Sequence, residues 1–374
     1  ISIIDNIIYP FLKVILLILL IILFSFNNNA IIFSFVLGFL IVSLLTFFYC
    51  RFKIPQIFLK SKLNIKTQKK ITKGFLSYSW PFLFFGTFSI FYYWTDSFVI
   101  GFFKSATEVG FYNAITPIAL LLNIIPVIFL QLFFPLITKE YALKNFNFIK
   151  EISKQIGKWI FMFNFPFFLL IVLFPKIIIN ILFGPEYLVA ANSLRLLAVG
   201  ILFASLFIIS NNLISMAGKS RIILYDVIIV SILDMILNIL LIPKPMIFEL
   251  DNSLGINGAA IATTISVITC NLLFLIQAKH YTSITPLKMD MFKIFLASLV
   301  PFFILLILSK IIIINLLSFI VLTIFFLLTY SFLLFLFKAF DKEDIMIFQT
   351  FKRKIKNDIL SKNFFIQIKF LLMF

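Results

Sequence analysis

Long apolar runs dominate the chain, and short polar stretches that carry most of its charge separate them. A helix needs about 20 apolar residues to cross the roughly 30 Å hydrocarbon core of a bilayer. Ten segments have this character, and the pattern predicts a helix in each: 7–26, 30–50, 75–103, 111–137, 157–182, 188–217, 221–242, 254–278, 291–309 and 311–337. The runs are apolar on all sides, whereas the strands of a membrane barrel alternate over about 10 residues. The sequence therefore predicts an all-α, polytopic membrane helix bundle.

The composition agrees with this pattern and excludes several classes of protein. The 374 residues are 62% hydrophobic and 13% charged, whereas soluble globular proteins are about 45–50% apolar and about 25% charged. A water-soluble enzyme or binding domain is therefore excluded. Lysine and arginine together number 32, against 15 acidic residues. In a membrane protein this excess is typical of loops retained in the cytoplasm, so we expect no nucleic-acid partner.

The basic residues also predict the orientation of the chain. Of the 32 lysines and arginines, 26 lie in alternate connections: 51–74, 138–158, 218–221, 279–293 and 338–374. Because cytoplasmic loops are enriched in lysine and arginine, we expect a multi-pass protein of the cytoplasmic membrane with both ends of this chain in the cytoplasm. The first apolar run lacks the basic start and cleavage site of a signal peptide. We therefore expect a fragment that lacks an even number of preceding spans.

Few residues suit catalysis or metal binding. Cys50 and Cys270 lie at or within apolar runs, and His280 is the single histidine. The sequence has no Gly-Lys phosphate-binding loop, no zinc-ligand spacing and no Ser-His-Asp arrangement. We therefore expect no enzyme activity, no cofactor and no metal site, and any transport must draw energy from a gradient or from removal of its product.

Residues 75–140 combine several features whose order is informative. Ser79 and Pro81 enter a predicted helix, Asp96 lies near its far end, and a V-G-x-Y motif follows at 109–112. Further segments come in a characteristic order: 182–203 with its G-x-x-Y, 211–221, 237–244 and 255–266. This set, over about residues 51–345, resembles the O-antigen and exopolysaccharide flippases of the multidrug/oligosaccharidyl-lipid/polysaccharide exporter superfamily.

The resemblance implies a two-lobed fold of about 12–14 helices around a central cavity, with six helices in each lobe. On that map the chain contains the last two helices of the N-terminal lobe (1–50), a basic cytoplasmic linker (51–74), the C-terminal six-helix lobe (75–278), an additional helix pair (279–337) and a cytoplasmic basic tail (338–374). About four helices of the first lobe would then precede this chain, an even number, as the charge pattern requires.

The resemblance also implies a function and its alternatives. The first is translocation of a polyprenyl-phosphate-linked oligosaccharide across the cytoplasmic membrane for cell-surface polysaccharide synthesis. Its partners would be the lipid-linked glycan, membrane lipids, a coupling cation and a polysaccharide polymerase or ligase. A second function is cation-coupled multidrug export. A third, an integral-membrane glycosyltransferase, is disfavoured because the predicted external connections are short.

Polar residues within the predicted spans are candidates for the transport site, because each is costly there unless it is paired or faces water. Asp234 lies near the middle of its span, and Asn238 follows one turn later on the same face. Asp96 lies near the external end of its helix, with Lys104 beyond it. These side chains either line the cavity, where they bind sugar hydroxyls or a coupling cation, or form hydrogen bonds between helices.

Three basic residues are candidates for contact with the phosphate of a lipid-linked glycan. Arg195 lies within the span 188–217. Its planar guanidinium matches phosphate geometry, although the side chain could instead extend towards the interface. Lys154 and Lys158 are expected at the cytoplasmic mouth of the cavity, where either phosphate attraction or the general bias for basic cytoplasmic loops explains them.

Asp226 is the remaining candidate at the cytoplasmic mouth. It lies about one turn inside its span, within reach of Lys219 or Arg221. An ion pair with one of these residues at the membrane interface is the simpler interpretation.

Two further expectations concern local structure. Pro117, Pro126 and Pro135 recur at nine-residue intervals in one span, and each is expected to kink the helix. The tail 341–374 mixes basic and apolar residues and is expected to form an amphipathic helix at the membrane surface.

Overall fold

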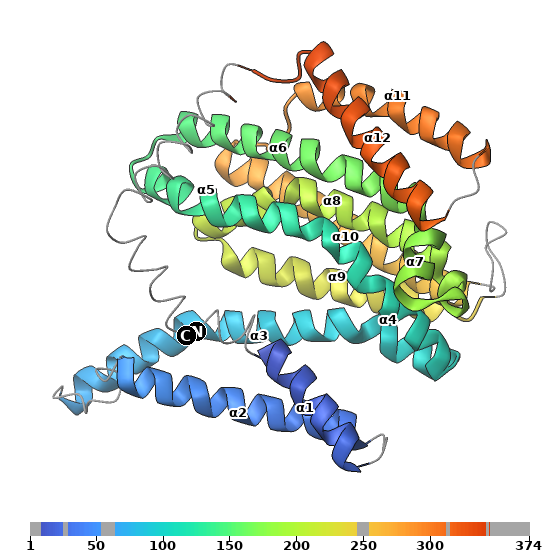
Figure 1. The fold of residues 1–374 in the computed structure, drawn as a ribbon. Helices are drawn as coiled ribbons and strands as arrows, with labels where there is room; N and C mark the ends of the chain where they lie inside the picture. Colours follow the sequence, from blue (N-terminus) through green and yellow to red (C-terminus); the bar gives the residue numbers. More distant parts are fainter. Residues whose placement is uncertain are drawn as a thin grey trace. The chain divides into compact units, whose positions relative to one another are not determined.

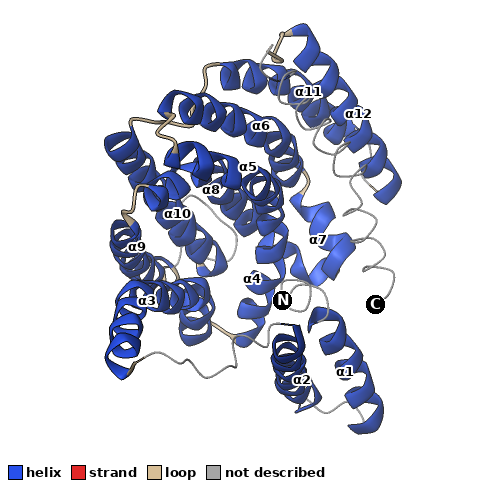
Figure 2. Cartoon of the chain, turned by 90° about the vertical axis from the view of Figure 1, so that its left-hand side faces the viewer, coloured by secondary structure: helices blue, strands red, loops and turns tan. Residues whose placement is uncertain are grey.

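The computed structural model describes residues 9–24, 29–53, 64–244, 254–311, 315–341 and 344. This part of the chain consists of helices joined by short connections and contains no strand (Figure 2). Eight of its helical segments are long and apolar enough to cross a membrane, and the shorter apolar segment Tyr9–Ile22 is a further candidate. The expected all-α, polytopic fold is confirmed, with a number of spans near the predicted ten.

Residues 1–78 form one compact unit. In this unit α1 (Tyr9–Phe24) packs against α2 (Asn29–Lys53), and both lie where spans were expected. α3 (Ile65–Phe103) begins ten residues before its expected span, because no glycine or proline interrupts 65–73. Within the segment 51–74, which was expected to be a basic cytoplasmic linker, residues 51–53 and 65–74 are helical, and residues 54–63 lie outside the described chain.

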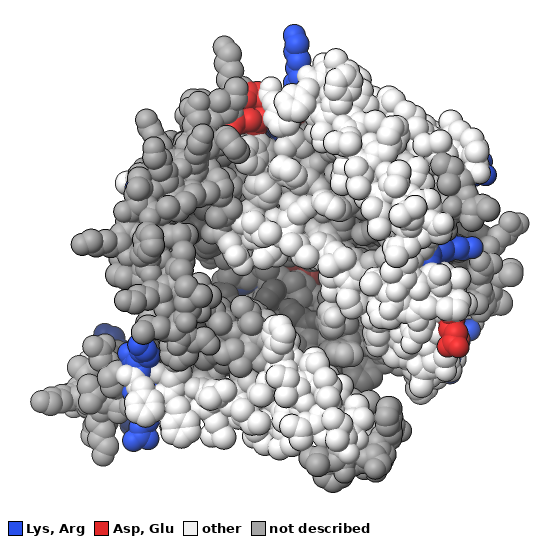
Figure 3. Space-filling model, in the orientation of Figure 1, with Lys and Arg blue, Asp and Glu red and all other residues white. Residues whose placement is uncertain are grey.

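Residues 79–374 form the second unit, into which α3 continues. Its other elements are α4 (Ala106–Leu120), η3 (Leu121–Asn123), α5 (Ile124–Ala142), α6 (Phe146–Leu173), α7 (Pro175–Phe183), η4 (Pro185–Ala190), α8 (Ala191–Met216), α9 (Ser220–Leu241), α10 (Gly255–Thr282), α11 (Asp290–Ile311) and α12 (Leu316–Leu336) (Figure 1). α8 packs against α10, α6 and α4. In the view of Figure 3 the described surface is mostly uncharged, as expected of helices in lipid.

Two expected spans are interrupted. The run 111–137 divides into α4 and α5 at η3, and the run 157–182 divides at Pro175, which separates α6 from α7. α6 also begins at Phe146, eleven residues before the predicted start. It begins early because Asn145 caps its first turn and because isoleucines with helical spacing, at positions 149, 152 and 156, bury one face.

The break at η3 follows from the position of a proline. Pro126 has no N–H, so the carbonyl of Leu122 loses its helical donor. The buried amide of Asn164 on α6 donates to that carbonyl over 2.8 Å. Of the three predicted kinks, the described break lies between Pro117 and Pro126, whereas α5 continues past Pro135.

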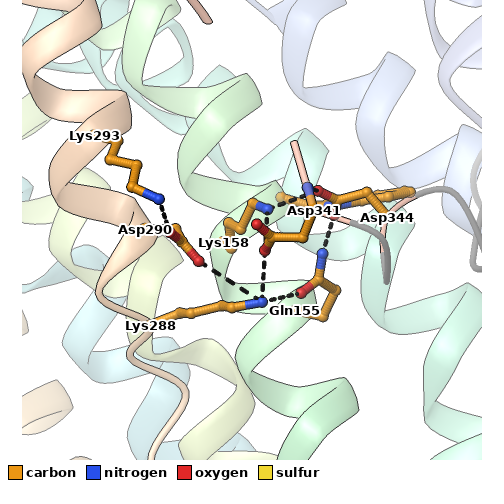
Figure 4. A network of polar contacts seen from close by, with 8 residues as sticks. Gln155, Lys158, Lys288, Asp290, Lys293, Asp341 and Asp344 are labelled. Carbon is orange, nitrogen blue, oxygen red and sulfur yellow. Dashed lines mark hydrogen bonds and ion pairs between the residues drawn. The ribbon is translucent and has the colours of Figure 1, made fainter. Parts of the chain in front are cut away.

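The additional helix pair is held to α6 by a polar network that we call the ion-pair clasp. It comprises Gln155, Lys158 and Trp159 of α6, Lys288 before α11, and Asp341 and Asp344 after α12 (Figure 4). Lys158 Nζ lies 2.6 Å from Asp344 Oδ2 and 2.9 Å from Asp341 Oδ2. Lys288 Nζ lies 2.8 Å from Asp341 Oδ2 and donates to Gln155 Oε1 over 2.9 Å.

The clasp corrects the prediction for Lys158. Lys158 was expected at a cavity mouth, but its side chain is fully buried and paired with two carboxylates. The sequence concealed this because Asp341 and Asp344 are more than 180 residues away. Of the basic tail expected at 338–374, only residues 338–341 and 344 are described, and the predicted amphipathic helix falls almost entirely outside the described residues.

The clasp predicts a dependence of stability on pH. Burial raises the pKa of Asp341, but hydrogen bonds and charge from Lys288 and Lys158 outweigh this effect and lower the pKa to about 2. An unfolded aspartate has a pKa of about 3.9. The ionised carboxylate therefore stabilises the folded state above about pH 5, and this stabilisation is lost as the pH falls towards about 2.

The measurement is the melting temperature of the parent and of Asp341→Asn between about pH 7 and about pH 3. The difference in melting temperature between the parent and Asp341→Asn is expected to be largest near neutral pH and to decrease as the pH falls. A difference that stays constant over this range would contradict the assignment.

Candidate functional site

Three of the predicted site residues meet in one buried cluster in the second unit. Asp96 comes from α3, and Asp234 and Asn238 come from adjacent turns of α9. The Asn238 amide donates to Asp96 Oδ1 over 2.8 Å and to Asp234 Oδ2 over 3.2 Å. The i to i+4 spacing on α9, read from the sequence, thus directs both polar side chains towards α3.

Two hydroxyl groups complete the surroundings of Asp96. Tyr112 of α4 donates to Asp96 Oδ2 over 2.5 Å, and Thr263 of α10 donates to the same oxygen over 2.6 Å. Tyr112 is the tyrosine of the V-G-x-Y motif, so this motif supplies a hydrogen-bond donor to the Asp96 carboxylate of the preceding helix. We call Asp96, Tyr112, Asp234, Asn238 and Thr263 the dicarboxylate cluster.

The dicarboxylate cluster is closed to solvent. Asp234 is 1% exposed, Asn238 0% and Asp96 7%. Neither carboxylate forms an ion pair with a described lysine or arginine. A carboxylate buried without a compensating positive charge is costly, so two such groups joined by one amide create a strong preference for a proton or a bound cation.

Two buried oxygen atoms at this site, Asn238 Oδ1 and Tyr92 Oη, lack a hydrogen-bond partner among the described residues. Ser266 of α10 lies within hydrogen-bonding reach of Asp234. Buried polar atoms are normally satisfied, and exceptions are often explained by an ion or water. Carboxylate, amide and hydroxyl oxygens from several helices suit a hard cation, and ionisable groups at such positions typically mark ion or proton pathways.

Three of the site's contributors were not predicted as site residues. Tyr92 lies one helical turn before Asp96, and its buried hydroxyl is close enough to feel the charge of both carboxylates. Thr263 lies on α10 next to Thr264 and three residues before Ser266, so nothing in the sequence sets it apart from the other hydroxyl side chains of this helix. Helical spacing from Asp96 could have found Tyr92, but the contributions of Tyr112 and Thr263 depend on how α4 and α10 pack.

Arg195 has a different position from the one expected for a phosphate ligand. Its Nε donates to the carbonyl of Val172 over 2.9 Å, and its Nη1 donates to Asn192 over 2.9 Å. Val172 lies in the last turn of α6, just before the break at Pro175. Arg195 therefore satisfies a carbonyl that the end of a helix leaves without a partner.

Substitution of Arg195 tests this role. Arg195→Met is expected to lower the free energy of unfolding by about 1–3 kcal/mol, because Val172 loses its charged donor. The measurement is thermal unfolding in detergent, with Arg221→Met, at an exposed arginine of α9, as the control. Unchanged stability with complete loss of transport would instead support the phosphate role.

The remaining candidates lie away from the dicarboxylate cluster's contacts. Asp226 accepts a hydrogen bond from Gln277 of α10 over 2.9 Å, so the predicted ion pair with Lys219 or Arg221 is wrong within the described chain. The reason is the rotation of α9, which buries Asp226 but leaves both basic side chains exposed. Lys104 follows the end of α3, and Lys154 is half-buried on α6.

Comparison with known proteins gives matches to two family models. The model described as a polysaccharide biosynthesis protein matches residues 1–141, and the MatE model matches residues 81–240. An uncharacterized membrane protein of Methanocaldococcus jannaschii is 39% identical over 98 residues, which cover 26% of this chain and 18% of that protein.

A solved structure shares the fold. The lipid II flippase MurJ, in its inward closed conformation, matches with a TM-score of 0.65 and 22% sequence identity, over 87% of this chain and 65% of that one. The chain therefore spans less than two thirds of the length of either relative. The chain is thus similar to polysaccharide biosynthesis proteins over residues 1–141 and to MatE proteins over residues 81–240, and it shares the fold of a flippase.

Proposed function

We propose that the protein moves a polyprenyl-phosphate-linked oligosaccharide from the cytoplasmic to the outer leaflet, and that a proton or monovalent cation bound at the dicarboxylate cluster drives it. The observation that carries the proposal is the burial of Asp96 and Asp234 around one shared amide. The match to a polysaccharide biosynthesis family supports the substrate class. The glycan would then pass to a polymerase or ligase at the outer face.

The position of the cluster suggests how a cation could affect transport. Asp96 lies on α3, the helix that runs from the first unit into the second, while Asp234 and Thr263 lie on α9 and α10. Neutralising the carboxylates changes the energy with which α3 is held against these helices. A cation that binds one packing arrangement better than another shifts the population towards it, as alternating access requires.

The charge distribution adds a proposal for topology. With lysine and arginine concentrated in alternate connections, both ends of this chain lie in the cytoplasm under the positive-inside rule. Labelling of a single cysteine introduced near residue 70 or near residue 280 from each side of the membrane tests this orientation.

The direct test uses cells that lack the protein. Outer-leaflet lipid-linked glycan, measured by an impermeant lectin or enzyme, is expected to fall, while the same glycan accumulates on the cytoplasmic side. The full-length protein should restore it. Surface glycan that does not change on deletion, in cells without a redundant exporter, would overturn the proposal.

The MatE match over residues 81–240 supports a second candidate, cation-coupled export of drugs. In that case deletion would leave surface glycan unchanged and would raise sensitivity to cationic drugs. The two measurements on the same strain therefore separate the candidates.

A further inference from the structure

A carbonyl in the middle of α6 receives a hydrogen bond from the additional helix pair. The Tyr330 hydroxyl of α12 donates to the backbone oxygen of Met162 over 2.8 Å, and both residues are buried. Met162 lies four residues before Pro166, which has no N–H to donate to it. Tyr330 thus replaces the hydrogen bond that the proline removes from α6.

A similar arrangement occurs at the break between α4 and α5. Pro126 leaves the Leu122 carbonyl without a donor, and Asn164 of α6 supplies one. The two cases differ in the origin of the donor. Asn164 lies on α6, close in sequence to the helices that it joins, whereas Tyr330 lies on α12, the second helix of the additional pair.

Two more contacts fix the helix pair to the same part of α6. Lys158, one turn before Met162, holds Asp341 and Asp344 in the ion-pair clasp. Gly157 faces the carbonyl of Pro286 in the connection before α11, so closely that a Cβ atom could not fit there. The segment before α11 and the segment after α12 therefore both contact α6 within about two turns of Met162.

We propose that the α11–α12 pair holds α6 in place at Pro166, with Tyr330 as the positioning residue and the ion-pair clasp as its second fixed point. The pair is then a brace for α6, and its role does not depend on which substrate the protein carries. A helix without this proline needs no such donor, because an ordinary residue at position 166 would supply its own N–H to Met162.

A double-mutant cycle tests the brace in the full-length protein in detergent. Tyr330→Phe removes only the hydroxyl and is expected to lower the melting temperature by about 3 °C. In the Pro166→Ala background the same change is expected to cost less than about 1 °C, because the alanine restores a backbone N–H that donates to Met162. Tyr225→Phe, at an exposed tyrosine of α9, is the matched control and should change nothing.

The proposal would be overturned if Tyr330→Phe lowered the melting temperature equally with Pro166 and with Pro166→Ala. It would also be overturned if the substitution lowered the melting temperature in neither case. A second measurement does not depend on stability. Spin labels at the exposed positions Phe148 of α6 and Phe332 of α12, in a Cys50→Ser, Cys270→Ser background, report the distance between the two helices. Tyr330→Phe is expected to broaden a narrow distance distribution. An unchanged distribution would show that α12 does not need the hydroxyl to keep its place on α6.

Discussion

Lys158→Met is expected to unfold the protein at a much lower temperature than the parent. The substitution keeps much of the side-chain volume but leaves Asp344, which is 6% exposed, without its cation, whereas Asp341 keeps its ion pair with Lys288. Breaking a buried ion pair by removing one partner costs about 3–5 kcal/mol, because a charge stays buried without compensation. The measurement is thermal unfolding in detergent, with Lys154→Met, at a half-buried lysine of α6, as the control.

A combined variant separates lost charge balance from lost packing. Asp344→Asn, added to Lys158→Met, removes the stranded carboxylate and is expected to recover most of the melting temperature. This follows because a complete buried ion pair is often no more stabilising than its neutral replacement. If Lys158→Met behaves like Lys154→Met, or if the combined variant recovers nothing, the clasp does not act through charge.

Asp234→Asn is expected to reduce transport strongly without weakening the fold. The amide has the shape of the carboxylate but cannot bind a proton or cation in the same way. Coupling free energies between sites are typically about 1–3 kcal/mol, which predicts a loss of about 5- to 150-fold. Stability should stay equal or rise, because a buried amide costs less than a buried carboxylate.

The measurement is restoration of outer-leaflet lipid-linked glycan in cells that lack the protein, normalised to the amount of protein in the membrane. Asp226→Asn is the matched control, since Asp226 is also a buried aspartate of α9 but is hydrogen-bonded to Gln277. Asp96→Asn should resemble Asp234→Asn. If Asp234→Asn restores surface glycan as well as the parent does, the coupling role of the dicarboxylate cluster is rejected.

The candidate site was only partly predictable from the sequence. Asp96, Asp234 and Asn238 stand out because charged and amide groups within apolar runs are costly and therefore informative. Their hydroxyl partners do not stand out, because tyrosine and threonine are ordinary residues of membrane helices. The contacts of three other candidates could not be predicted from neighbouring charges in the sequence. Arg195 binds a carbonyl at the end of a helix, Asp226 binds a glutamine, and Lys158 binds two aspartates that are distant in the sequence.

The apolar pattern alone identifies an all-α membrane protein and the positions of most of its helices, because the length of an apolar run decides whether a helix can cross a bilayer. Tertiary structure decided where helices break and which polar groups meet. A proline shows which carbonyl loses its donor, but only packing shows that Asn164 and Tyr330 replace it. The same holds for Asp96 and Asp234, which lie 138 positions apart in the sequence and are joined because the Asn238 amide donates a hydrogen bond to each.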